Sequence, residues 1–323
     1  MKMKASIYTH YGPPEVIQFR EVEKPMPAER EVLIKVYAGT VNRTDCGFRS
    51  AEYFISRFFS GFIRPKNKTL GNEFAGVVEA VGSKVTLFVA GDRVFGYNDV
   101  TFGAHAEYMV MPEHAAIATI PRNLKFEEAA PICEGGHYAL CDIRAAKVKR
   151  GQNVLVYGAT GAIGSAAVQL LKYFGANVTA VCATQHTDLV KSLGAREVID
   201  YLKQDFAETV QRFDFILDAV GKSSYAACQK ILTNKGIYIS TELGKHSVNV
   251  LLALITPLSG GRKVLFPLPT ISKKDVIFLK ELVENGNFKP VIDRKYRFDQ
   301  LVEAYHYVET RQKTGNVVIT IAE

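Results

Sequence analysis

Residues 153–176, NVLVYGATGAIGSAAVQLLKYFGA, carry the pattern that decides the fold of this chain. Residues 154–157 form a short apolar run, which is typical of a strand buried on both faces. Apolar residues then recur at helical spacing up to Phe174, and Gly175 stands where a helix C-cap belongs. The order of strand, glycine turn and helix predicts the first half of a dinucleotide-binding βαβ unit.

The glycine turn carries a variant of the G-x-G-x-x-G pattern, Ala159-x-Gly161-x-x-Gly164, with Gly158 one position earlier. A helix that begins at this turn presents free N–H groups and the positive end of its dipole, which suit a pyrophosphate. The alternative is a glycine turn that only permits tight packing. The residues expected to hold the cofactor here are Gly158, Ala159, Thr160, Gly161, Ala162 and Ile163.

The composition is that of an ordinary globular protein, with 323 residues, 47% hydrophobic and 23% charged. The net charge of +7 is spread along the chain, which indicates a solvated surface and not a nucleic-acid site. Five scattered cysteines without a C-x-x-C pair favour reduced thiols and a cytoplasmic location. No apolar run is long enough to span a bilayer, and the N-terminal segment lacks the apolar core of a signal peptide.

The chain changes character near residue 123. Before it, strands are expected at 4–8, 16–21, 31–38, 73–81, 93–97 and 106–110; after it, helices are expected at 126–132 and 136–143. Strands at 154–157, 178–182, 197–199, 213–217, 237–240 and 263–266 then alternate with helices near 162–174, 187–193, 204–211 and 224–232. Ser272 and Asp275 resemble a capping box for a helix that Gly286 closes, and 317–321 returns to strand. The alternation predicts an α/β fold with a doubly wound parallel sheet.

Short motifs follow one another in a recognisable order: VNRTD at 41–45, LGNEFAG at 70–76, GDRVFG at 91–96, SLGA at 192–195, DAVG at 218–221 and GNVV at 315–318. With the glycine turn, they resemble the medium-chain dehydrogenase/reductase superfamily, in its branch of zinc-independent quinone oxidoreductases. The resemblance implies a GroES-like β-barrel catalytic domain from residues 1–122 and 271–323, and a Rossmann NADP(H)-binding domain from residues 123–270. It also implies a homodimer, in which the apolar stretch 248–258 followed by 263–266 would extend the sheet across a two-fold axis, or would simply be core.

The resemblance also bears on metal binding. Zinc-dependent members of the superfamily supply a Cys near position 45 and a His where Asn72 stands. This chain has Asp45 and Asn72 there, and no cysteine between Cys46 and Cys133. Because catalytic zinc needs three protein ligands and Asn is a poor one, we expect no metal. Without a Lewis acid, hydride delivery to an already activated acceptor is favoured over alcohol oxidation.

The cofactor is expected to be NADPH. A Rossmann domain that prefers NAD places an acid at the end of its second strand. Here Thr184 and His186 follow that strand, with no acid until Asp188, and both can donate hydrogen bonds to a 2′-phosphate. The resemblance adds further cofactor-binding positions, namely Tyr201 at the phosphate, Val220 and Asn316.

At the reacting end, the resemblance assigns Asn42 and Asp45 to the nicotinamide and substrate, and Tyr53 to a quinone oxygen or ring. The alternatives are a local Asx turn for the first two and ordinary packing for Tyr53. The predicted reaction is hydride transfer from NADPH to a quinone or an α,β-unsaturated carbonyl, a small-molecule substrate. A reductase of enoyl thioesters or alkenals, and a non-catalytic nucleotide-binding or structural protein of the same fold, remain as alternatives.

Overall fold

The computed structural model describes residues 1–52 and 56–322, and it divides the chain into two compact units. The first unit comprises residues 1–134, 271–284 and 291–323, and the second comprises residues 135–270 and 285–290. The first unit is thus assembled from both ends of the chain, and it includes residues 123–134. Within the described ranges, no helix has the length and apolar character needed to cross a membrane.

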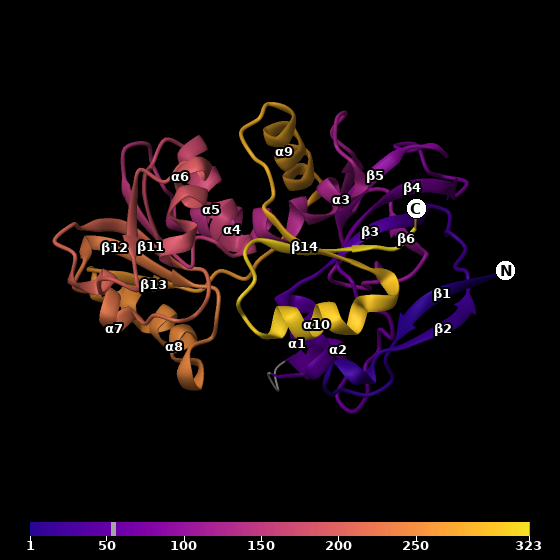
Figure 1. The fold of residues 1–323 in the computed structure, drawn as a ribbon, viewed down its shortest axis with the longest axis horizontal. Helices are drawn as coiled ribbons and strands as arrows, with labels where there is room; N and C mark the ends of the chain where they lie inside the picture. The colour runs from indigo at the N-terminus through magenta and orange to yellow at the C-terminus, as the bar shows by residue number, and fades with distance from the viewer. Residues whose placement is uncertain (53–55, 323) are drawn as a thin grey trace. The chain divides into compact units, whose positions relative to one another are not determined.

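The first unit is built on β-structure (Figure 1). Its described residues form a seven-stranded sheet in the order β14-β15-β3-β4-β5-β7, with β6 also paired to β3, and a separate antiparallel pair β1-β2. The strands are β1 (Lys2–Ile7), β2 (Gln18–Glu23), β3 (Glu31–Val41), β4 (Glu73–Val81), β5 (Arg93–Tyr97), β6 (Tyr108–Pro112), β7 (Ile117–Thr119), β14 (Ile292–Arg297) and β15 (Asn316–Thr320). The antiparallel pairing of β15 with β3 places the C-terminal segment inside the sheet, between β14 and β3.

Short helices surround this sheet: α1 (Arg43–Ser50), α2 (Ser56–Ser60), α3 (Phe126–Ala129), α9 (Lys273–Glu284) and α10 (Leu301–Glu309). The predicted capping box of α9 is present. The Asp275 carboxylate accepts from the Ser272 backbone N–H at 2.9 Å, and the Asp275 N–H donates to the Ser272 hydroxyl at 3.4 Å. Helix α4 (Cys133–Ala146) begins in the first unit and continues in the second.

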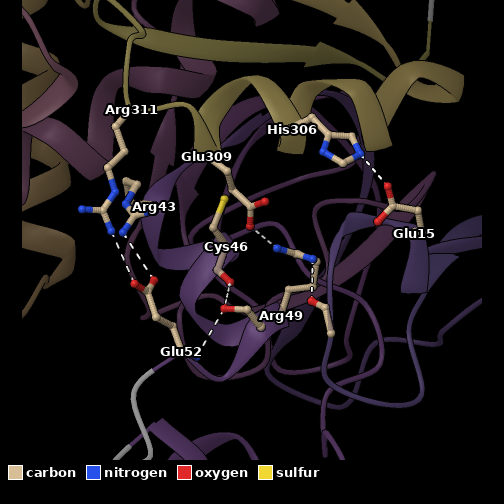
Figure 2. A network of polar contacts seen from close by, with 10 residues as sticks. Glu15, Arg43, Cys46, Arg49, Glu52, His306, Glu309 and Arg311 are labelled. Carbon is tan, nitrogen blue, oxygen red and sulfur yellow. Dashed lines mark hydrogen bonds and ion pairs between the residues drawn. The ribbon is translucent and has the colours of Figure 1, made fainter.

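A polar network ties α1 to α10 and to the N-terminal segment (Figure 2). Arg49 is only 1% exposed; it pairs with Glu309, donates to the Gly12 carbonyl at 2.6 Å and lies over the Tyr305 ring at 5.3 Å. His306 contacts Glu15 at 2.7 Å across the same interface. A buried guanidinium is tolerated only when it is paired and hydrogen-bonded, so these contacts hold three distant segments of the first unit in one arrangement.

The second unit contains a six-stranded, all-parallel sheet in the order β10-β9-β8-β11-β12-β13. The strands are β8 (Asn153–Tyr157), β9 (Asn177–Cys182), β10 (Glu197–Asp200), β11 (Phe213–Asp218), β12 (Leu232–Ser240) and β13 (Lys263–Leu265). This is the doubly wound order with a switch point beside β8, where such folds bind dinucleotides. The predicted parallel sheet is confirmed.

Helices α5 (Ala162–Tyr173), α6 (Thr187–Leu193), α7 (Tyr225–Cys228) and α8 (Val248–Ile255) connect these strands. Helix α5 ends as expected: Gly175 has a φ of +78°, and the Ala176 N–H donates to the Leu171 carbonyl at 3.0 Å. That bond, with Gly175 N–H to the Lys172 carbonyl at 2.9 Å, is a Schellman motif.

Two predicted helices are wrong in extent. Residues 204–211 hold only a 3₁₀ turn, Phe206–Glu208, which the Asp205 carboxylate caps by accepting from the Ala207 N–H at 2.9 Å. Helix α7 ends at Cys228, since β12 begins at Leu232. The apolar stretch from Val248 is not a pairing strand but helix α8.

Candidate functional site

The glycine turn of the second unit joins β8 to α5. Gly158 has a φ of +76°, and a Cβ at this position would lie 2.5 Å from a methyl group of Val220. A Cβ at Gly164, in the first turn of α5, would lie 2.1 Å from the Gly158 carbonyl oxygen. Both positions therefore require glycine, one for the left-handed turn and the other for close approach of the helix to it.

Gly161 differs from these two glycines. It is the N-cap of α5 with a φ of −68°, and the nearest atom to a Cβ there would be the Gly158 carbonyl oxygen at 3.8 Å. The space beside Gly161 is therefore open, and the residue has no side chain to accept from the N–H groups of the first turn. An open approach to free N–H groups at a helix N-terminus fits the pyrophosphate of a dinucleotide.

The other predicted residues of this turn frame that opening. Thr160 and Ile163 are partly exposed, whereas Ala159 and Ala162 are buried against the strand. Val220 follows β11 and is held by Asp218, whose carboxylate accepts from the Val220 N–H at 3.2 Å and from the Ser223 N–H at 2.9 Å. Burial raises the pKa of Asp218.

An acid that the sequence argument missed lies at the expected phosphate end. Asp200 closes β10 and pairs in register with Cys182 of β9, so it comes beside the residues that follow β9. The Thr184 hydroxyl donates to the Asp200 carboxylate at 2.5 Å, and Lys203 lies 3.5 Å from the same oxygen. The Thr184 hydrogen bond is the main cause that lowers the pKa of Asp200. His186 is partly exposed and Tyr201 is 50% exposed.

Asp200 bears on the expected preference for NADPH over NADH. The end of β9 carries no acid of its own, as the sequence shows, but parallel pairing brings one from the neighbouring strand. The signal was present in the sequence as an Asp at the end of the third strand of the unit. Its proximity to Thr184 depends on the pairing of β10 with β9, which the sequence of either strand alone does not show.

In the first unit, Asn42 and Asp45 form a capping box on α1. The Asn42 side chain accepts from the Asp45 N–H at 3.0 Å, and the Asp45 carboxylate accepts from the Asn42 N–H at 3.2 Å and the Gly71 N–H at 3.0 Å. Asp45 is 0% exposed and Asn42 is 4% exposed. The local side-chain-to-backbone bonding that was the alternative for Asn42 and Asp45 is thus present, and it fixes the side chain of Asn42.

A chain of buried amide and carboxyl groups continues from Asn42. Its amide donates to the Asn72 oxygen at 2.6 Å, and the Asn72 amide contacts the Glu134 carboxyl at 3.3 Å and the Tyr97 hydroxyl at 3.2 Å. The Thr44 hydroxyl lies 2.7 Å from the other Glu134 oxygen. Glu134 is 4% exposed, while Thr44 is partly exposed.

Glu73 lies beside this chain and is 0% exposed. Its carboxyl accepts from the Thr40 hydroxyl at 2.7 Å and from the Glu134 backbone N–H at 2.6 Å. Burial, followed by the nearby Glu134 charge, raises the pKa of Glu73 to about 8, and burial raises the pKa of Glu134 to about 7. Both carboxyls can therefore carry a proton near neutral pH.

From the sequence, Glu73 is considered only as a possible metal ligand together with Asp45 and His105, and Glu134 is not considered at all. Glu134 is a lone charged residue within the apolar segment 129–140, and Glu73 directly follows Asn72 in a motif. A charge inside an apolar run is the signal that could have identified Glu134, because burial of a carboxyl requires hydrogen-bonding partners.

Two predicted site residues remain, Asn316 and Tyr53. Asn316 is 5% exposed in the first unit, where its amide donates to the Val291 carbonyl at 2.9 Å. Tyr53 lies outside the described residues. Across residues 1–52 and 56–322, no group of three or more His, Cys, Asp and Glu side chains is arranged to hold a metal ion.

Comparison with known proteins places this geometry in a family. Residues 28–122 match the model of the alcohol dehydrogenase GroES-like domain, and residues 193–319 match that of the zinc-binding dehydrogenase. The chain is 36% identical to the 2-methylene-furan-3-one reductase of Solanum lycopersicum, over 98% of this chain and 79% of that protein. It is 31% identical to the chloroplastic NADPH-dependent alkenal/one oxidoreductase of Arabidopsis thaliana, with the same coverage of 98% and 79%.

The solved quinone oxidoreductase of Coxiella burnetii matches with a TM-score of 0.89 and 26% identity, covering 100% of both chains. The expected combination of a GroES-like domain with a Rossmann-type parallel sheet is confirmed by these matches. The sequence motifs, the two units and the relatives agree, and the chain belongs to the medium-chain dehydrogenase/reductase family, in its quinone oxidoreductase branch.

Proposed function

We propose that this protein is an NADPH-dependent, zinc-independent reductase that transfers a hydride to a quinone or an α,β-unsaturated carbonyl. The observation that carries the proposal is the glycine turn at the switch point of the parallel sheet, with open space beside Gly161. Relatives named as a furanone reductase and an alkenal/one oxidoreductase support this class of acceptor.

The residues of the second unit would hold the cofactor in distinct ways. The N–H groups at the start of α5, behind Gly161, would bind the pyrophosphate. Val220, held in place by Asp218, would lie against the cofactor beside Gly158. When bound, NADPH supplies the hydride.

The preference for NADPH over NADH rests on the groups that follow β9. His186 and Tyr201 are accessible and can donate hydrogen bonds to a 2′-phosphate. The negative charge of Asp200 opposes a phosphate, but Thr184 and Lys203 already contact that carboxylate. We assign the 2′-phosphate to His186 and Tyr201, with Thr184 kept on Asp200.

At the reacting end, we assign the nicotinamide ribose or the substrate carbonyl to Asn42. Asp45 acts as a positioning residue, because its carboxylate holds the backbone N–H groups of Asn42 and Gly71. Tyr53 is kept as a candidate for the substrate, and Asn316 for the cofactor. Asn72 is engaged by Asn42 and Glu134 through its amide, which supports a reaction without zinc.

The test is turnover by the purified protein with NADPH and with NADH. Acceptors would be a quinone, an alkenal, a 2-methylene-furanone and an enoyl thioester, each before and after treatment with a metal chelator. We expect NADPH to be oxidised faster with the quinone or the enones, and chelation to leave the rate unchanged. Preference for the enoyl thioester would support the alternative reductase, whereas tight NADPH binding without turnover would show a binding role.

We also propose a homodimer formed through the second unit. Strand β13 stands at the end of the strand order, so its outer edge can pair with a second copy. Beside it, α8 and the following turn expose large apolar side chains: Leu251 at 58%, Leu254 at 70% and Leu258 at 87%. Light scattering should give twice the chain mass, and Leu254→Lys should lower it toward that of one chain.

A further inference from the structure

Three carboxyl groups are buried together in the first unit, but their surroundings differ. Asp45 binds backbone N–H groups of Asn42 and Gly71. Glu73 binds the Thr40 hydroxyl, which is 1% exposed, and the Glu134 backbone N–H. Of the three, as far as the described contacts go, Glu134 alone contacts a side chain that reaches the surface.

That side chain is Thr44, whose hydroxyl lies 2.7 Å from Glu134 Oε1 and is partly exposed. Glu134 Oε2 is held by the Asn72 amide at 3.3 Å. The carboxyl thus has one oxygen on an amide donor and the other on the Thr44 hydroxyl, which can both accept and donate a proton. The buried Tyr97 hydroxyl also hydrogen-bonds this carboxyl. Thr44 lies two residues from Asn42, within the same turn of α1.

We propose that Glu134 supplies the proton that completes the reduction, and that the Thr44 hydroxyl passes it to the substrate. The inference rests on the proposed function and adds its proton donor. When the β-carbon of an enone accepts a hydride, the C=C electron pair moves to form an enolate. The enolate takes the Thr44 proton and Thr44 takes the Glu134 proton, so that a saturated carbonyl, NADP⁺ and an ionised Glu134 result. Solvent then returns the proton to Glu134.

The protonation state of Glu134 agrees with this role. Burial raises the pKa of its carboxyl to about 7, so a large fraction carries a proton at neutral pH. Among the described residues, titratable groups on several elements interact with Glu134. They are Asp45 on α1, Glu73 on β4, Tyr97 on β5, Asp99 after β5, Cys133 on α4 and Lys313 before β15. The Lys313 charge favours ionisation of Glu134 and that of Asp99 opposes it.

The test compares Glu134→Gln, Thr44→Val and Thr44→Ser with the unchanged protein, using kcat and kcat/KM from pH 5.5 to 9. For an enone, we expect the unchanged protein to lose activity as the pH rises through about 7, because Glu134 then ionises. Glu134→Gln should lower kcat by roughly 100-fold or more and remove that pH dependence. Thr44→Val removes the hydroxyl and should lower kcat similarly. Thr44→Ser keeps the hydroxyl, so its kcat should stay close to that of the unchanged protein.

Two comparisons separate proton delivery from a structural effect. A quinone with strongly electron-withdrawing groups gives a weakly basic anion, so Glu134→Gln should slow its reduction far less than that of the enone. Glu73→Gln serves as the matched buried control. Its rate of enone reduction should keep the pH dependence that the titration of Glu134 produces. Equal losses for both acceptors, or an unchanged pH profile in Glu134→Gln, would overturn the inference and leave the proposed function standing. No turnover by the unchanged protein with any acceptor would instead refute the proposed function, and the proton donor with it.

Discussion

In the proposed cofactor site, the Asp200 side chain would influence the preference between NADPH and NADH. Its carboxylate lies at the end of β10, beside the residues that follow β9, and it accepts from the Thr184 hydroxyl. A full negative charge near a 2′-phosphate costs binding energy, although Lys203 at 3.5 Å reduces that cost. The residue therefore opposes NADPH more weakly than an unpaired acid would.

Asp200→Asn should strengthen NADPH binding. Because the removed charge is already screened, we expect a roughly two- to fivefold lower Kd for NADPH with little change for NADH. Fluorescence titration of both cofactors checks this. Asp188→Asn is the matched control, because Asp188 is exposed in the first turn of α6 and should leave the ratio unchanged. A higher Kd for NADPH in Asp200→Asn would mean that Asp200 supports the site through Thr184.

The turn between β8 and α5 is the element on which the proposed cofactor binding depends. Its glycines are needed for different physical reasons. Gly164 packs against Gly158, whereas Gly161 faces open space. We therefore expect opposite results from one substitution at the two positions. Gly161→Ala should fold with unchanged thermal stability and bind NADPH about tenfold more weakly, since its methyl group occupies the approach of the pyrophosphate.

Gly164→Ala should instead destabilise the second unit, by roughly 1–3 kcal/mol, because its Cβ would lie 2.1 Å from the Gly158 carbonyl oxygen. Calorimetry and NADPH titration of both variants distinguish the two effects. If Gly161→Ala bound NADPH as tightly as the unchanged protein, the pyrophosphate would have to lie away from this N-terminus.

The sequence predicts elements well where one periodicity is strong, and poorly where tertiary contacts decide. The strand–turn–helix at β8–α5 and the capping box of α9 follow from local pattern and cap chemistry. No element is predicted from the sequence for residues 292–309, which form β14 and α10. Their strand pairs with β15 and their helix packs on α1, so distant partners stabilise both.

The candidate site shows the same limit. The residues of the glycine turn are contiguous and could be named from the sequence. Asp200 and Glu134 could not, because Asp200 reaches Thr184 through strand pairing and Glu134 reaches Asn72 across 62 residues of chain. The sequence holds a hint of each residue, an acid at a strand end and a charge inside an apolar run, but only contacts between separate segments show which groups they meet.

At the scale of the whole molecule, buried titratable groups make stability depend on pH in two opposite directions. Glu73 and Glu134 have pKa values raised from 4.5 to about 8 and about 7. The fold accommodates the neutral forms of these two carboxyls. Their contribution to the free energy of unfolding is therefore complete below about pH 4.5 and is lost as the pH rises through 7 to 8. His105 is buried on the Thr40 carbonyl with its pKa lowered to about 4, and its contribution is lost as the pH falls below 6.5.

Glu73→Gln isolates the carboxyl part of this behaviour. The amide keeps an oxygen for the Glu134 N–H and can donate to the Thr40 hydroxyl, but it never ionises. From pH 5 to 9, the free energy of unfolding of the unchanged protein should therefore fall relative to that of Glu73→Gln, by on the order of 3 kcal/mol. Calorimetry at intervals across this range gives the difference directly, and His105 cancels because both proteins contain it. Parallel curves for the two proteins would mean that Glu73 stays ionised, with Thr40 and the Glu134 N–H sufficient to stabilise a buried charge.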